Sequence, residues 1–195
     1  MPLQPVSSFA AGCPTNYADV PICIMPPSGG VYWVGTQTNS NGTSAPAVNE
    51  FRLSPVFITS TVLLDRIAGK VTTGAASSTV RLGIYADSGA GVPGRLILDA
   101  GTIDGNSVST QAITISQVLA PGLYWIGGVS QGGTPTVQVT SGNSMLGMPH
   151  SFGATYDPTI SVNGYNMTGV SGALPATYTV AAVIGTVPRI GLRVA

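Results

Sequence analysis

Very few side chains in this sequence could carry out catalysis or hold a metal ion. The chain has one histidine, His150, and two cysteines, Cys13 and Cys23, which lie far from it in the sequence. A structural zinc site needs about four Cys or His ligands, and a catalytic one needs about three. We therefore expect no metal site and no cofactor, and we interpret His150 as a loop residue.

Residues 128–132 have the G-x-S-x-G spacing of a nucleophile elbow, with Ser130 as the nucleophile. In that motif a strand turns sharply into a helix, and an acid and a histidine follow the serine along the chain. Here Pro135 and a strand-like segment follow, and no Asp or Glu separates Ser130 from His150. The sequence favours a β-turn over an acyl-transfer site.

Residues 89–94 match G-x-G-x-x-G, the fingerprint of dinucleotide-binding folds. That chemistry needs a helix to begin at the glycines, so that its N-terminal amides meet the pyrophosphate. Pro93 and the strand-like residues 95–98 argue against a helix here. The segment is more typical of a glycine-rich hairpin loop.

The carboxylates give no sign of a catalytic pair. Asp87, Asp99 and Asp104 fall near the ends of expected strands, where Asp commonly fixes a turn through its own side chain. Glu50 is the only glutamate. A glycosidase needs two carboxyl groups that face each other across a cleft, so we expect that the protein is not an enzyme.

Aromatic residues are the remaining candidates for recognition. Trp125 lies in a strongly apolar segment and is expected in the core. Tyr32 and Trp33 lie in a Gly- and Pro-rich region, which favours an interface role. Tyr156 and Tyr165 lie in a long Gly-, Pro- and Asn-rich stretch, 141–175, and are the candidates for contact with a ligand.

The chain divides into two parts by composition. Residues 1–50 contain scattered prolines and one short β-like run, 31–34, which predicts an extended N-terminal arm. Residues 51–195 contain many short, often alternating apolar segments separated by Gly, Pro, Asn or Asp, which predicts an all-β, jelly-roll-like antiparallel sandwich. The expected strands include 51–53, 56–58, 62–67, 79–85, 96–98, 101–103, 112–115, 123–126, 136–140, 178–180 and 190–194.

Charged residues are rare and balanced, with seven Lys and Arg against seven Asp and Glu among 195 residues. The cations are scattered singly, which argues against nucleic-acid binding, and no apolar run approaches the roughly 20 residues of a membrane helix. The positive mean hydropathy, +0.36, favours a permanent assembly whose apolar surfaces are covered by other subunits.

Residues 1–4 show no start of a secretory signal, so we expect folding in a reducing compartment. A reducing compartment favours free thiols at Cys13 and Cys23. A disulfide between them, which would close a short loop, stays open as the alternative.

Residues 50–195 contain an ordered series of strand and turn motifs at 64–67, 71–74, 80–88, 93–94, 98–101, 119–125 and 188–193. In these motifs the region resembles a β-rich domain that recurs in virion proteins of tailed bacteriophages, among them minor tail proteins and tail fibres. The resemblance implies a jelly-roll-like domain that is commonly a homotrimer within a virion and that is assembled in the cytoplasm of the host. Because only about 50 residues precede the sandwich, with no shaft or coiled coil, a capsid decoration protein is a related option.

We therefore expect a non-enzymatic virion structural protein, attached to other capsid or tail proteins through residues 1–50. Its sandwich, residues 51–195, would be displayed at the particle surface. The alternative is a carbohydrate-binding module that recognises host surface glycans through exposed tyrosines.

Overall fold

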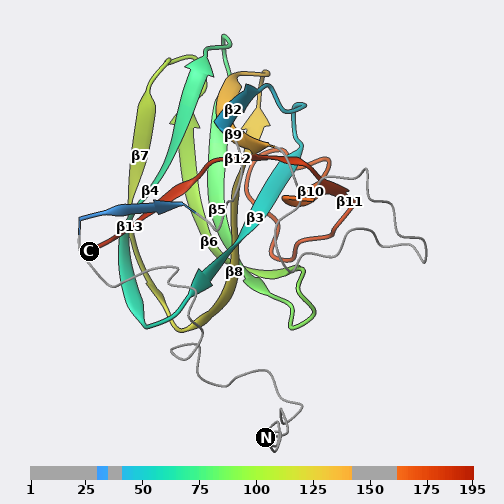
Figure 1. The fold of residues 1–195 in the computed structure, drawn as a ribbon. Coiled ribbons are helices and arrows are strands. Elements are labelled where there is room, and N and C mark those ends of the chain that lie inside the picture. The colour runs from blue at the N-terminus through green and yellow to red at the C-terminus, as the bar shows by residue number, and fades with distance from the viewer. Residues whose placement is uncertain (1–29, 35–40, 142–161) are drawn as a thin grey trace, which may run out of the picture.

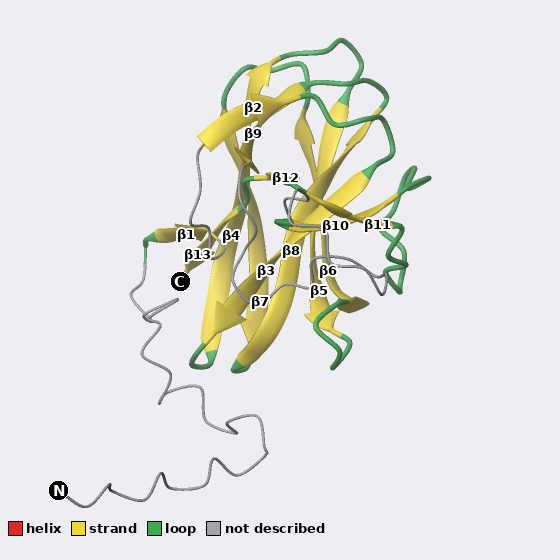
Figure 2. Ribbon diagram, turned by 45° about the vertical axis from the view of Figure 1, so that its right-hand side comes forward, coloured by secondary structure: helices red, strands yellow, loops and turns green. Residues whose placement is uncertain are grey.

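The computed structural model describes residues 30–34, 41–141 and 162–195. These residues form strands and loops and no helix, as Figure 2 shows. The strands, labelled in Figure 1, are β1 (Tyr32–Val34), β2 (Asn41–Ser44), β3 (Phe51–Ile58), β4 (Val62–Thr73), β5 (Thr79–Asp87), β6 (Pro93–Asp104), β7 (Thr110–Leu119), β8 (Gly122–Gln131), β9 (Thr136–Ser141), β10 (Gly164–Met167), β11 (Ala182–Ile184), β12 (Thr186–Pro188) and β13 (Gly191–Val194).

Strands β2 to β9 wind as a jelly roll. One antiparallel sheet has the order β2-β9-β4-β7 and the other has the order β3-β8-β5-β6. The chain changes sheet at every connection between these strands except at the β5–β6 hairpin, which gives the eight-stranded double sheet of a jelly roll. The predicted jelly-roll-like antiparallel sandwich is confirmed.

The remaining strands extend both sheets. In the first sheet, the C-terminal residues form β12 beside β9 and then β13 beside β4, and β1 pairs with the far edge of β13. In the second sheet, β10 pairs with β3, and β11 pairs with β10. The C-terminal segment therefore fills the space where β4 and β9 separate.

Two of these strands come from the part of the chain that the sequence assigns to the arm. β1 pairs with β13, and β2 pairs with β9, so both belong to the first sheet. The boundary expected after residue 50 thus cuts through the sandwich, because short runs such as Asn41–Ser44 carry no apolar pattern that would mark them as strands. The rest of the expected arm, 1–29 and 35–40, lies outside the described residues.

The main core lies between the two sheets and follows from alternation along the strands. In β5, the predicted apolar face of Val80, Leu82 and Ile84 is buried. These side chains pack in the main core with inward-facing residues of both sheets. The buried members of this core are Val56, Ile58, Val62, Leu64, Ile67, Val71, Val80, Leu82, Ile84, Ile103, Leu119, Ile126, Val137, Val139, Ile190, Leu192 and Val194.

A second core covers the outer face of the second sheet. The loop 168–181 lies over this face and buries Val170, Leu174 and Tyr178 against aromatic residues of the strands. The Tyr178 ring meets Phe51 edge to face, with ring centroids 5.6 Å apart. The loop also covers part of the edge of β6, where Leu96 N donates a hydrogen bond to Ala176 O at 2.8 Å.

Candidate functional site

A pocket of about 450 Å³ opens on the outer face of the first sheet. The strand register sets its floor: Ala112 of β7 pairs with Ala68 of β4, and Ala68 pairs with Gly191 of β13. Because cross-strand partners share a face of the sheet, these small residues form one row. The low row leaves a hollow between the longer side chains of the neighbouring rows.

Polar and aromatic side chains surround this floor. Lys70 and its cross-strand partner Thr110 form the next row on β4 and β7. Tyr32 lines the pocket from β1, Gln138 from β9 and Arg189 from the link between β12 and β13. Five strands or links that are far apart in sequence thus contribute to one small surface.

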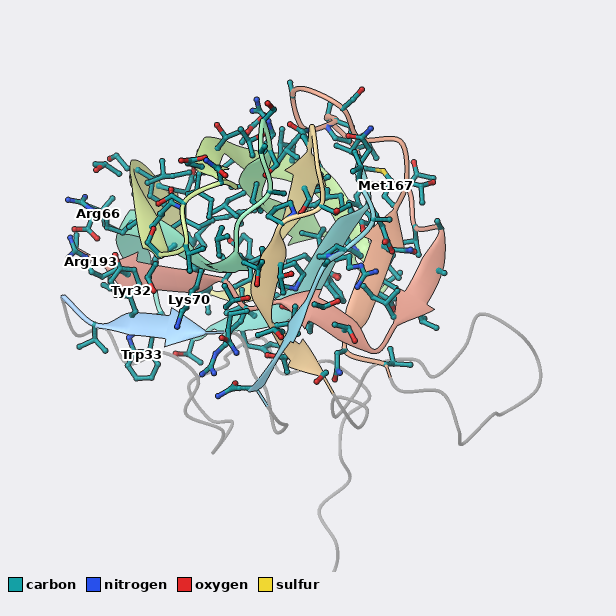
Figure 3. All side chains as sticks on the ribbon, turned by 90° about the horizontal axis from the view of Figure 1, so that it is seen from above. Tyr32, Trp33, Arg66, Lys70, Met167 and Arg193 are labelled. Atoms are coloured by element: carbon teal, nitrogen blue, oxygen red, sulfur yellow. The ribbon has the colours of Figure 1, made fainter. Side chains whose placement is uncertain are left out.

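The rows around the pocket are rich in cations. Arg66 of β4 and Arg193 of β13 are cross-strand partners on the outer face, and Arg193 is also the partner of Tyr32. With Lys70 and Arg189, they place four of the chain's seven cations at or beside the pocket. Figure 3 labels Tyr32, Arg66, Lys70 and Arg193 at the same side of the molecule, next to β1. The chain has no net charge, but it carries a locally positive surface here.

Asp65 is the carboxylate residue in these rows, and it accepts a hydrogen bond from Arg193. The Arg193 Nε atom donates to Asp65 Oδ1 at 2.8 Å, and Arg66 Nη1 lies 4.0 Å from Asp65 Oδ2. The hydrogen bond from Arg193 holds the pKa of Asp65 below its usual value. Among the described residues, no ion pair involves Lys70 or Arg189.

The polar partners of Arg189 and Gln138 are neutral groups. Arg189 donates a hydrogen bond to the side-chain oxygen of Asn41. Gln138 Nε2 donates to the Gly42 carbonyl oxygen at 2.8 Å, which fixes its amide group and leaves Oε1 as a hydrogen-bond acceptor. Both side chains are held in place by β2, and Arg189 keeps its charge uncompensated by these contacts.

The two residues predicted at an interface, Tyr32 and Trp33, lie on opposite faces of β1. Tyr32 is 44% exposed and lines the pocket. Trp33 faces the other side of β1, as the partner of Leu192, and packs against the main core. Its indole Nε1 is buried and has no hydrogen-bond partner in the part of the chain that the structure describes. Whether either residue contacts another protein stays a prediction.

The expected surface position of Tyr165 is wrong. Tyr165 lies in β10, is completely buried, and packs on Trp125 with ring centroids 5.1 Å apart. Burial raises the pKa of its phenol to about 12. The residue therefore belongs to the second core and offers no surface to a ligand, whereas Trp125 is in the core as predicted. Tyr156, the other candidate, lies outside the described residues.

The catalytic-looking motifs are parts of strands and turns. Ser130 lies inside β8 and is buried, so the β-turn predicted at residues 128–132 is wrong. Residues 89–92 connect β5 to β6, residues 93–94 begin β6, and no helix follows them. Asp87 and Asp99 each accept a hydrogen bond from the backbone N–H two residues later, at 2.7 and 3.2 Å. The predicted turn role is confirmed for Asp87, at the end of β5, and for Asp104, at the end of β6, which accepts a hydrogen bond from Asn106 N at 2.9 Å. Asp99 lies inside β6, so its predicted place near a strand end is wrong.

The described residues contain no group of three or more His, Cys, Asp or Glu side chains arranged to hold a metal ion. His150, Cys13 and Cys23 lie outside the described ranges. Within those ranges, no helix is long and apolar enough to span a membrane.

Sequence reasoning did not find Lys70, Thr110, Gln138 and Arg189. Each is an ordinary polar residue within or next to a strand, and only the pairing of β4, β7, β9 and β13 brings them together. One signal was present: Lys70 is the only lysine of the chain and interrupts an otherwise uncharged strand segment after Ile67.

No protein-family model matches the sequence, and no curated protein matches it.

Proposed function

We propose that this chain is a non-enzymatic structural protein of a bacteriophage virion. The observation that carries the proposal is the jelly-roll winding of β2 to β9, an architecture that viral capsid and lectin domains use. Most of the residue pattern that resembles phage tail proteins lies on the strands and turns of β2 to β9, and its last segment, 188–193, runs from the end of β12 into β13. A minor tail protein, a tail fibre and a capsid decoration protein all fit this description.

The N-terminal segment is the part that we expect to attach the protein to other virion proteins. Gly30 N donates a hydrogen bond to Val194 O at 2.9 Å, and β1 then pairs with β13, so the segment joins the sandwich at this edge. Residues 1–29 contain six prolines, which favour extended backbone. Such a segment can add backbone hydrogen bonds and apolar anchors to a neighbouring protein.

The opposite edge of the first sheet is where we place contacts between copies in a homotrimer. β7 contains no charged residue over its ten positions, and β4 is its only partner strand among the described residues. Val118 of β7 and its cross-strand partner Leu63 are 58% and 43% exposed. Long, uncharged edge strands readily pair with another chain, so a second copy suits this edge.

The test uses a phage that encodes this chain, with the gene shortened to remove residues 2–29. This cut retains β1 and β2, so that the sandwich keeps both of these strands. We expect the shortened protein to fold but to be missing from purified particles. Normal incorporation would overturn the attachment role of the N-terminal segment.

Recognition of host surface glycans is the second candidate function. The observation that favours it is the pocket on the first sheet, where an exposed tyrosine and two cations that have no carboxylate partner among the described residues lie around a floor of small residues. Glycan recognition and a structural role are compatible in one virion protein, because the pocket and the N-terminal segment use different groups.

A further inference from the structure

We propose that the pocket of Tyr32, Lys70, Thr110, Gln138 and Arg189 binds a sugar that carries a carboxylate group. The proposal rests on the second candidate function, glycan recognition, and assigns it a site and a ligand class. The pocket volume of about 450 Å³ lies within the range of roughly 300 to 1,000 Å³ that is typical of small-molecule sites.

The charges of the site select an anion. Lys70 and Arg189 both line the pocket, and neither takes part in an ion pair of the described residues. The guanidinium group of Arg193, beside them, is hydrogen-bonded to Asp65. The Asp65 carboxylate therefore already has a cationic partner. A carboxylate on the ligand would supply the missing partner through charge-assisted hydrogen bonds, for which the fork of Arg189 is well suited.

The neutral groups of the site suit a sugar ring. Arg193 lies over one face of the Tyr32 ring, and the exposed remainder of the ring offers an apolar surface against which a sugar can pack. Thr110 offers a hydroxyl group, and the fixed amide of Gln138 offers an acceptor oxygen, for ring hydroxyls. The floor of Ala68, Ala112 and Gly191 lets a flat ligand approach the sheet closely.

The same residues argue for binding without hydrolysis. Glycoside hydrolysis in most enzyme families needs two carboxyl groups at the scissile bond. Among the described residues, the lining of the pocket contains no Asp or Glu. We therefore assign the site to binding of an acidic glycan and not to its hydrolysis.

The test is a titration of the full chain with tetragalacturonic acid, with maltotetraose as the neutral counterpart and glucose 6-phosphate as the phosphate counterpart. We expect binding of the acidic oligosaccharide only, weakened by added salt because the contact is ionic and partly exposed. Equal binding of maltotetraose, stronger binding of glucose 6-phosphate, or no binding of any of the three would overturn the proposal.

Variants locate the site. Lys70→Gln and Arg189→Gln should each weaken binding of tetragalacturonic acid about tenfold, the factor expected for one charge-assisted contact. Arg95→Gln is the matched control, because Arg95 is an exposed cation of β6 without an ion pair among the described residues. Equal losses in all three variants would contradict the site.

A failed titration would leave the virion role intact. Incorporation into particles is measured separately, on the protein shortened at its N-terminus, and does not depend on Lys70 or Arg189.

Discussion

The guanidinium group of Arg193 lies over the ring of Tyr32, with its central carbon 5.7 Å from the ring centroid. Because Arg193 also bonds to Asp65 of β4, one side chain links β1, β13 and β4 on the outer face of the first sheet. The contact is a cation–π interaction at the surface. It keeps Tyr32 next to the floor of the pocket, so the N-terminal strand contributes to the candidate binding site as well as to the sheet.

The Tyr178 hydroxyl group stabilises the second core. Its oxygen lies 2.9 Å from Phe51 O and 3.0 Å from Tyr165 O, and its single O–H is shared between these two buried carbonyl groups. Tyr178→Phe removes this donor and should lower the free energy of unfolding by about 1–3 kcal/mol. Urea denaturation measures the change. Tyr124→Phe, whose exposed hydroxyl bonds to Ala120 O, is the control and should shift stability by less than about 0.5 kcal/mol.

Close approach of β3 and β8 explains the glycine at position 127. A Cβ atom there would lie 1.9 Å from Arg52 O, a backbone atom that cannot move aside cheaply. Gly127→Ala should therefore lower the free energy of unfolding by more than about 3 kcal/mol, or prevent folding.

Gly122→Ala in the same strand is the matched control. The nearest atom to a Cβ at position 122 is Tyr124 Cε2, at 3.5 Å, an ordinary contact. Equal thermal stability of the two variants would contradict the described packing of β3 on β8.

The partly buried carboxylate of Asp99 predicts a loss of stability in acid. Burial raises the pKa of Asp99, but hydrogen bonds from Leu174 N, Arg81 and Gly101 N outweigh it and leave the pKa below its usual value. A carboxyl group whose pKa is lower in the folded state stabilises the fold fully above its unfolded pKa of about 4. The melting temperature should be level between about pH 7 and 5 and should fall below about pH 4.

Asp99→Asn tests this assignment. The variant should be less stable at pH 7 and should show a weaker fall in melting temperature below about pH 4. Asp104→Asn, at an exposed turn, should follow the unmodified protein at all pH values. If the melting temperature of Asp99→Asn fell below about pH 4 as steeply as that of the unmodified protein, the role of Asp99 would be contradicted.

The edge strand β7 should determine whether the protein is a trimer or a monomer in solution. Val118→Lys places a charge on the exposed apolar pair of Val118 and Leu63, and lysine on an edge strand opposes pairing with another chain. Light scattering at low micromolar concentration should give the mass of a trimer for the unmodified protein and of a monomer for Val118→Lys. Val48→Lys, at another exposed valine, should remain a trimer. A monomeric unmodified protein, or a trimeric Val118→Lys, would contradict the interface.

The sequence predicted the sandwich because alternation is a local property of each strand. Val80, Leu82 and Ile84 alternate with polar or small residues, and this pattern alone places them in the core. Many short strands separated by turn residues favoured a jelly-roll-like sandwich, but the order in which the strands pair was not predictable from the sequence. β2 was not predicted, because Asn41–Ser44 has no apolar residue and becomes a strand only through its pairing with β9.

The candidate site depended on long-range register, which the sequence does not encode in any local pattern. Ala68 and Ala112 are 44 positions apart, and Gly191 is further still, yet they form one row. Tyr165 was misplaced for the opposite reason. Its surroundings are rich in Gly and Asn, which suggests a loop, but its own aromatic ring packs on Trp125 once β10 pairs with β3.

The most direct test of the virion role is immunogold electron microscopy of purified particles of a phage that encodes this chain. The antibody should be raised against the sandwich, which we propose is displayed at the particle surface. We predict gold label at regular positions on intact capsids or tails, and the chain among the proteins of the purified particle. Unlabelled particles, with the protein left in the soluble fraction of the lysate, would contradict the account.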